Sequence, residues 1–156
     1  MRLCVVAIGQ RMPGWVDQAW QEYARRFPRH LPLELREVPA VRRFRHSAID
    51  TARERESEAL MGAAGAAGRV VALDESGRQW STLELSRQLA SWMQEGADIS
   101  FLVGGPDGLT RECIRRADFH WSLGRLTLPH PMVRLVLAEQ LYRAWTITQN
   151  HPYHRA

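Results

Sequence analysis

Two short segments of this 156-residue chain combine residue types that suit small-molecule binding. The first is GGPDG at 104–108, whose glycines let a backbone approach a ligand closely and expose N–H and C=O groups to it. The second is WSLGRLTLPHP at 121–131, where leucines stand beside Gly124 and two prolines. Apolar side chains with free backbone groups suit a heterocycle such as adenine. Each segment also has a purely structural interpretation: a tight turn for the first, a core-plugging loop for the second.

A third candidate is the C-terminal tail, NHPYHRA at 150–156. His154 could act as a base, Tyr153 as a stacking or hydrogen-bonding ring, and Arg155 as an anion ligand. His151 and His154 are three residues apart, but no carboxylate or thiol accompanies them. We therefore expect no metal site, and a metal hydrolase stays an alternative that a chelator would reveal.

The basic residues point to a polyanionic partner. The net charge is +4, and all 21 basic residues are arginines, whose planar forks grip phosphate. Coding bias toward arginine would give the same count. Residues 25–46 hold seven arginines against two glutamates, a local charge of +5. Such a patch indicates a nucleic-acid partner, or else a solvated face. The seven are Arg25, Arg26, Arg29, Arg36, Arg42, Arg43 and Arg45.

These segments need a scaffold, and the sequence predicts an α/β sandwich around a mostly parallel sheet. Apolar or alternating runs predict strands at 2–8, 33–38, 69–74 and 99–104, with 75–80 as a turn. Helical spacing and caps predict helices at 13–27, 48–64, 81–95, just after 110, and 131–150. On the first helix we expect Trp15, Ala19, Tyr23 and Phe27 to form the buried face.

In an open α/β sheet, ligands bind beyond the carboxyl ends of the strands. Those ends carry Leu73-Asp74 and the GGPDG segment, which makes these two loops the expected ligand site. The usual nucleotide fingerprints are missing: the chain has no lysine for a P-loop, and no G-x-G-x-x-G opens a helix. A G-x-S-x-G nucleophile elbow is missing too.

Several features describe the protein as a whole. No composition break divides the chain, so we expect one domain over 1–156. Two cysteines, Cys4 and Cys113, cannot make a disulfide framework, and no apolar run could span a membrane, so we expect a cytoplasmic protein.

The last helix is apolar on two sides, with Glu139, Arg143 and Thr146 as its polar line. A homodimer would bury both sides.

Three motifs in order, LVGGPDG, LTLPHPMVRLVLAEQLYRAW and NHPYHR, carry a family resemblance that covers the whole chain. The sequence resembles the ribosomal large-subunit pseudouridine N3-methyltransferases of the SPOUT superfamily. The resemblance implies an α/β fold with a C-terminal trefoil knot, and S-adenosylmethionine as cofactor. It also implies a homodimer in which the tail of one protomer completes the site of the other. The substrate would be a pseudouridine in a 23S rRNA stem-loop of the assembled ribosome.

The resemblance also assigns residues. Tyr153, His154 and Arg155 would be catalytic, and the arginines at 25, 26, 29, 42, 43 and 45 would grip rRNA backbone. His130 is a second candidate base or a structural histidine. Two rivals remain: a SPOUT enzyme that modifies tRNA, and a non-catalytic rRNA-binding assembly factor. The implied cofactor contacts are Leu73, Gly104, Gly105, Leu123, Gly124, Arg125, Leu126, Thr127 and Leu128.

Overall fold

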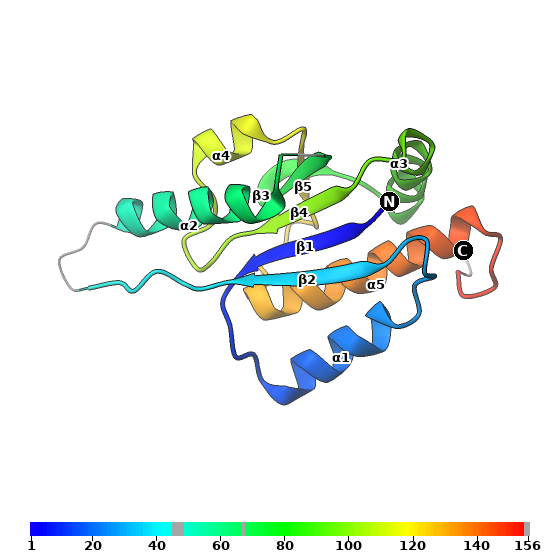
Figure 1. The fold of residues 1–156 in the computed structure, drawn as a ribbon, viewed down its shortest axis with the longest axis horizontal. Helices are drawn as coiled ribbons and strands as arrows, with labels where there is room; N and C mark the ends of the chain where they lie inside the picture. The colour runs from blue at the N-terminus through cyan, green and yellow to red at the C-terminus, as the bar shows by residue number, and fades with distance from the viewer. Residues whose placement is uncertain (45–48, 67, 155–156) are drawn as a thin grey trace.

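The computed structural model describes residues 1–44, 49–66 and 68–154, and within them five parallel strands form one sheet (Figure 1). The strand order is β2-β1-β4-β3-β5, and every neighbouring pair is parallel. The predicted α/β architecture is therefore confirmed. The strands are β1 (Leu3–Ile8), β2 (Leu33–Val38), β3 (Arg69–Gln79), β4 (Ile99–Val103) and β5 (Phe119–Ser122).

Helices cover both faces of the sheet, which explains why β1 is apolar throughout. Leu3, Val5 and Ala7 pack into the core shared with α1 (Gly14–Ala24), α3 (Thr82–Glu95) and α5 (His130–Thr148). Cys4, Val6 and Ile8 face the opposite core, under α2 (Ile49–Ala64) and α4 (Arg111–Arg116). Figure 1 shows α2 and α4 on one side of the strands, with α1 and α5 on the other.

Local capping signals fixed two helix starts correctly. Ser81 accepts a hydrogen bond from the backbone N–H of Glu84, and the Glu84 side chain accepts one from the backbone of Ser81. This capping box starts α3 where the sequence predicts it. The hydroxyl of Thr110 likewise accepts from the backbone N–H of Cys113 and starts α4.

The turn predicted over 75–80 is wrong, because β3 continues to Gln79. Its pairing with β5 shifts between Leu73 and Arg78, both of which lie opposite Trp121. A Cβ on Gly77 would lie 2.7 Å from the Trp121 carbonyl carbon, so glycine permits this approach. Pairing with β5, which lies more than 40 residues later in the chain, therefore keeps this irregular stretch of β3 in the sheet.

The buried face predicted for the first helix is only partly correct. Trp15 is 58% exposed, whereas Val16 and Trp20 are buried. Tyr23 packs against the core as predicted, and Phe27 enters the core from beyond the end of α1 at Ala24. The buried stripe therefore begins at Val16 and Trp20, one position after the predicted Trp15 and Ala19.

Helix α5 is the longest in the described residues, and none of their helices is long and apolar enough to cross a membrane. Its predicted polar line is only partly correct. Glu139 and Arg143 form an ion pair at 2.7 Å, but Thr146 is buried. The Thr146 hydroxyl is satisfied locally, since it donates to the carbonyl of Arg143 at 2.7 Å.

Candidate active site

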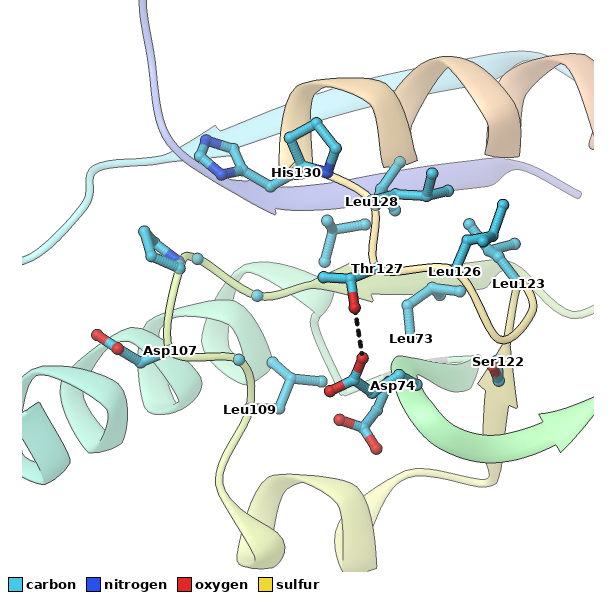
Figure 2. Close-up of a pocket in the computed structure, with 18 of the residues that line it drawn as sticks. Leu73, Asp74, Asp107, Leu109, Ser122, Leu123, Leu126, Thr127, Leu128 and His130 are labelled. Carbon is cyan, nitrogen blue, oxygen red and sulfur yellow. Dashed lines mark hydrogen bonds between the residues drawn. The ribbon is translucent and has the colours of Figure 1, made fainter.

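A cavity of about 800 Å³ opens at the carboxyl ends of β4 and β5, beside residues 73–75 in the middle of β3 (Figure 2). It lies where the topology of a parallel sheet places ligands. Two loops supply most of its wall: residues 104–108, here called the donor loop, and residues 122–130. The volume falls in the range of small-molecule sites.

Eight of the nine expected cofactor contacts line this one cavity. Apolar side chains from β3, α5 and the two loops form its walls, with backbone exposed at the glycines. The exception is Arg125, whose side chain is exposed and does not line the cavity. The eight are Leu73, Gly104, Gly105, Leu123, Gly124, Leu126, Thr127 and Leu128.

The donor loop is folded tightly on itself. The backbone N–H of Gly108 donates to the carbonyl of Gly105 at 3.0 Å. A Cβ on Gly104 would lie 2.8 Å from the carbonyl carbon of Gly108, and Gly108 has a φ of +73°. A side chain at Gly104 would therefore force the loop backbone to move.

Carboxylates occupy one side of the cavity. Partial burial raises the pKa of Asp74, but hydrogen bonds from Ser76 and His120 outweigh it and leave that pKa below its usual value. The His120 ring lies 3.0 Å from the Asp74 carboxylate. Next to it, the hydroxyl of Thr127 donates to Glu75 at 3.3 Å (Figure 2). This bond joins β3 to the loop before α5.

His130 stands where that loop becomes α5 and lines the cavity. Burial, followed by the nearby positive charge of Arg134, lowers its pKa. A lowered pKa favours the neutral imidazole, the form that can accept a proton as a base.

Arg134 is a buried arginine that sequence reasoning missed, with only 1% of its surface exposed. Its guanidinium donates to Glu37 at 2.7 Å and to the carbonyls of Ile8 and Gly9 at 3.2 and 2.8 Å. These contacts join the first turns of α5 to the ends of β1 and β2. Its position in an apolar stretch of helix was the only sequence signal.

The tail residues lie at the far end of α5. The Tyr153 ring packs edge-on against Tyr142, and its hydroxyl donates to Glu139 at 3.3 Å. Burial and the Glu139 carboxylate raise the pKa of Tyr153, so the phenol stays protonated. Nδ1 of His154 is buried and has no hydrogen-bond partner among the described residues. Arg155 lies outside them.

Within one protomer the tail and the cavity are separated. His130 begins α5 at the cavity, and Tyr153 lies beyond the last residue of that helix, Thr148. Tyr153 contacts Glu139, which is nine residues along α5 from His130, a rise of about 14 Å along the helix axis. The structure therefore brings eight of the expected cofactor contacts together, and neither Tyr153 nor His154 lines the cavity that they form.

The arginines expected to bind RNA have different surroundings. Arg25 and Arg26 at the end of α1 both pair with Glu22, and Arg29 is exposed. The guanidinium of Arg42 lies 5.3 Å from the centroid of the Phe44 ring.

Arg43 is instead engaged inside the protein. Hydrogen bonds to Glu56 and Asp107, in that order of effect, raise its pKa. Its charge is matched by two carboxylates, an environment that differs from that of the other arginines expected to bind RNA. Arg45 lies outside the described residues.

No cluster of three or more histidine, cysteine, aspartate or glutamate side chains in the described residues could hold a metal ion. The cavity itself is lined by glycine backbone, leucines and a few carboxylates, a lining that suits an organic ligand.

The fold and the cavity define an α/β protein with a candidate small-molecule site, and sequence comparison identifies its family. The family described as "Predicted SPOUT methyltransferase" matches residues 1–154. The chain belongs to this family of methyltransferases.

Two relatives match this chain over nearly the whole length of both proteins. The chain is 50% identical over 155 residues to the "Ribosomal RNA large subunit methyltransferase H" of Hahella chejuensis, covering 99% of both chains. Identity is also 50% to the protein of that name from Methylococcus capsulatus, over 99% of this chain and 100% of the other.

Solved structures share the fold at low identity. A "probable methylase family protein" from Haemophilus influenzae has a TM-score of 0.56 at 13% identity, over 99% of this chain and 70% of that one. TrmJ from Z. mobilis has a TM-score of 0.52 at 13% identity, over 97% of this chain and 72% of that one.

Proposed function

We propose that this protein transfers a methyl group from S-adenosylmethionine to N3 of a pseudouridine in a 23S rRNA stem-loop of the assembled ribosome. The main support is the cavity of about 800 Å³ in a SPOUT methyltransferase chain. Its near-full-length relatives are named as ribosomal RNA large-subunit methyltransferases. We further propose one cytoplasmic domain over 1–156 with a C-terminal trefoil knot.

The cavity fits the proposed cofactor in its chemistry. Leucines 73, 123 and 128 offer apolar walls for an adenine ring, and the glycines expose backbone groups that can hydrogen-bond its edge. The carboxylates of Asp74 and Glu75 line the same cavity and suit a ligand that carries positive charge. When bound, S-adenosylmethionine supplies a methyl group activated by its sulfonium.

The residues of the chain must then prepare the acceptor. N3 of a uracil-like ring holds a proton at neutral pH, so a base or an anion-stabilising group must assist. We assign His154 to accept or orient that proton, and Arg155 to stabilise the developing anion. Tyr153, which stays protonated, packs or hydrogen-bonds the nucleotide. Most of the rate gain then comes from positioning two bound reactants.

A homodimer unites the two halves of the site. The tail lies at the far end of α5 from the cavity of its own protomer, so a second copy must deliver it. On α5, Met132 is exposed and Val136 is only partly buried, which supports a partner on that face. The unpaired, buried Nδ1 of His154 supports a tail that gains a hydrogen bond from substrate or partner.

The rRNA surface comprises Arg25, Arg26, Arg29 and Arg42, and in the resemblance also Arg45. These residues position the phosphate backbone and do not read sequence. Arg43 is left out because it is engaged by Glu56 and Asp107.

The test is transfer of a labelled methyl group from S-adenosylmethionine to ribosomes, free large subunits, naked rRNA and tRNA, with and without pseudouridine. We expect label only in ribosomal acceptors that contain pseudouridine. Label in tRNA would favour a different SPOUT enzyme, and cofactor binding without transfer to any acceptor would favour an assembly factor.

A further inference from the structure

Residues 39–44, which form neither helix nor strand, are tied to two acidic residues by Arg43. Its Nε donates to Asp107 at 2.8 Å, and its Nη2 donates to Glu56 at 2.6 Å. Its Nη1 donates to Glu56 at 3.1 Å and to the carbonyl of Val41 at 2.8 Å. Most of the five N–H donors of the guanidinium are therefore used within the protein.

Glu56 is what fixes Arg43 in place. Its side chain lies on α2 and is only 1% exposed, and it also accepts from the backbone N–H of Val41 at 3.1 Å. A buried carboxylate is tolerated only when it is paired and hydrogen-bonded. The bidentate pair with Arg43 meets that requirement, so the arginine has little freedom to turn outward to a phosphate.

Both acidic partners of Arg43 meet the donor loop. Asp107 belongs to that loop, and Figure 2 shows its side chain pointing away from Leu73 and Thr127 in the middle of the cavity. A Cβ on Gly105 would lie 3.5 Å from each carboxylate oxygen of Glu56. The loop is therefore held between the cavity on its inner side and the Arg43 cluster on its outer side.

The neighbouring arginine has the opposite environment. Arg42 is exposed, with its guanidinium over the ring of Phe44, which is 62% exposed. Arg42 therefore faces solvent, whereas the neighbouring Arg43 is hydrogen-bonded to two acidic residues of the protein.

We propose that Arg43 is a positioning residue that holds the donor loop in its ligand-binding shape, and so contributes to methyl-donor affinity and not to RNA affinity. The inference rests on the proposed function, because it takes S-adenosylmethionine as the ligand of the cavity. It assigns Arg43 a role separate from the basic patch in which sequence reasoning placed it.

The test compares Arg43→Gln with the matched control Arg42→Gln, which removes the same charge one position away. Calorimetry measures the Kd for S-adenosylmethionine, and steady-state kinetics the KM for ribosomes. We expect Arg43→Gln to weaken cofactor binding on the order of tenfold and to leave the ribosome KM unchanged. Arg42→Gln should raise the ribosome KM and leave cofactor affinity unchanged.

A second readout needs no ligand. Hydrogen exchange of the backbone amides at 104–108 should accelerate in Arg43→Gln and not in Arg42→Gln. If Arg43→Gln fails to fold because Glu56 is left unpaired, Asp107→Ala removes only the link to the loop, since alanine has no acceptor for Arg43 Nε. This variant should accelerate hydrogen exchange at the same amides. Arg43→Lys should restore part of the protection that Arg43→Gln loses, wherever both variants fold.

Wild-type cofactor affinity and wild-type exchange at 104–108 in a folded Arg43→Gln protein would overturn the inference. Wild-type exchange at 104–108 in a folded Asp107→Ala protein would overturn it as well. If the wild-type protein itself binds no S-adenosylmethionine, the proposed function fails, and the exchange comparison still decides whether Arg43 positions the loop.

Discussion

His130 and Tyr153 contact different parts of helix α5: His130 begins the helix and lines the cavity, whereas Tyr153 folds back onto Glu139 in its second half. Nine residues of helix, about 14 Å along the axis, separate His130 from Glu139 in one protomer. An active site that needs both the cavity and the tail must therefore be assembled from two chains, and this makes the dimer part of the proposed chemistry.

Mixed dimers test that assembly. Gly104→Ala damages the cavity and His154→Ala damages the tail, so each homodimer should lose activity on the order of 10²-fold. A mixed dimer of the two variants, purified through two tags, contains one intact cavity facing one intact tail. We expect about half of wild-type turnover from it. Turnover as low as in either homodimer would mean that the tail serves its own protomer.

The glycine at the start of the donor loop is the second test. In Gly104→Ala the new Cβ would meet the carbonyl carbon of Gly108 at 2.8 Å, and the loop backbone would have to shift. We expect S-adenosylmethionine affinity to fall on the order of tenfold or more, by calorimetry. Gly62→Ala is the control, since nothing lies within 4 Å of its Cβ on α2, and it should bind normally. Equal affinity in both variants would contradict the role given to the loop.

Arg134 should matter to stability more than any surface arginine. Arg134→Met leaves Glu37 and the carbonyls of Ile8 and Gly9 without their donor. We expect a loss of about 3–5 kcal/mol in the free energy of unfolding, measured by urea denaturation. Arg115→Ala, which breaks an exposed pair with Glu112, should cost less than about 1 kcal/mol. A similar loss of unfolding free energy in both variants would contradict the larger stabilising role given to the buried Arg134 network.

Asp74 gives a prediction about pH. Its pKa is lowered from 3.8 in the folded state, so its stabilising effect is present above that value and is lost as pH falls through the folded pKa. Asp74→Asn should therefore be less stable than wild type at pH 7, by about 1 kcal/mol, with the difference vanishing in strong acid. Ser76→Ala, which removes one donor to Asp74, should show a smaller difference of the same sign. A pH-independent difference would contradict this account.

The sequence predicted the parts of the fold that local signals encode. The buried strands, the capping box at Ser81 and the cap at Thr110 depend on residues within four positions of one another. The donor loop was predicted to lie at the site because a parallel sheet gathers the carboxyl ends of its strands at one edge.

The remaining features depend on partners far away in the chain. Arg134 is buried because Gly9 and Glu37 meet it across the fold, and Arg43 turns inward because Glu56 and Asp107 face it. A basic run in the sequence does not distinguish an arginine that faces solvent from one that faces a carboxylate. Strand β3 likewise extends past Asp74 only because β5 is there to pair with it.

The most direct measurement is the identity of the methylated nucleoside. Ribosomes that carry pseudouridine but lack the methyl group would be incubated with the protein and S-adenosylmethionine bearing a deuterated methyl. The 23S rRNA would then be digested to nucleosides for mass spectrometry. We predict the deuterated methyl on N3 of pseudouridine, and none in ribosomes whose uridine was never isomerised. Label on any other nucleoside, or none despite bound cofactor, would contradict the proposed function.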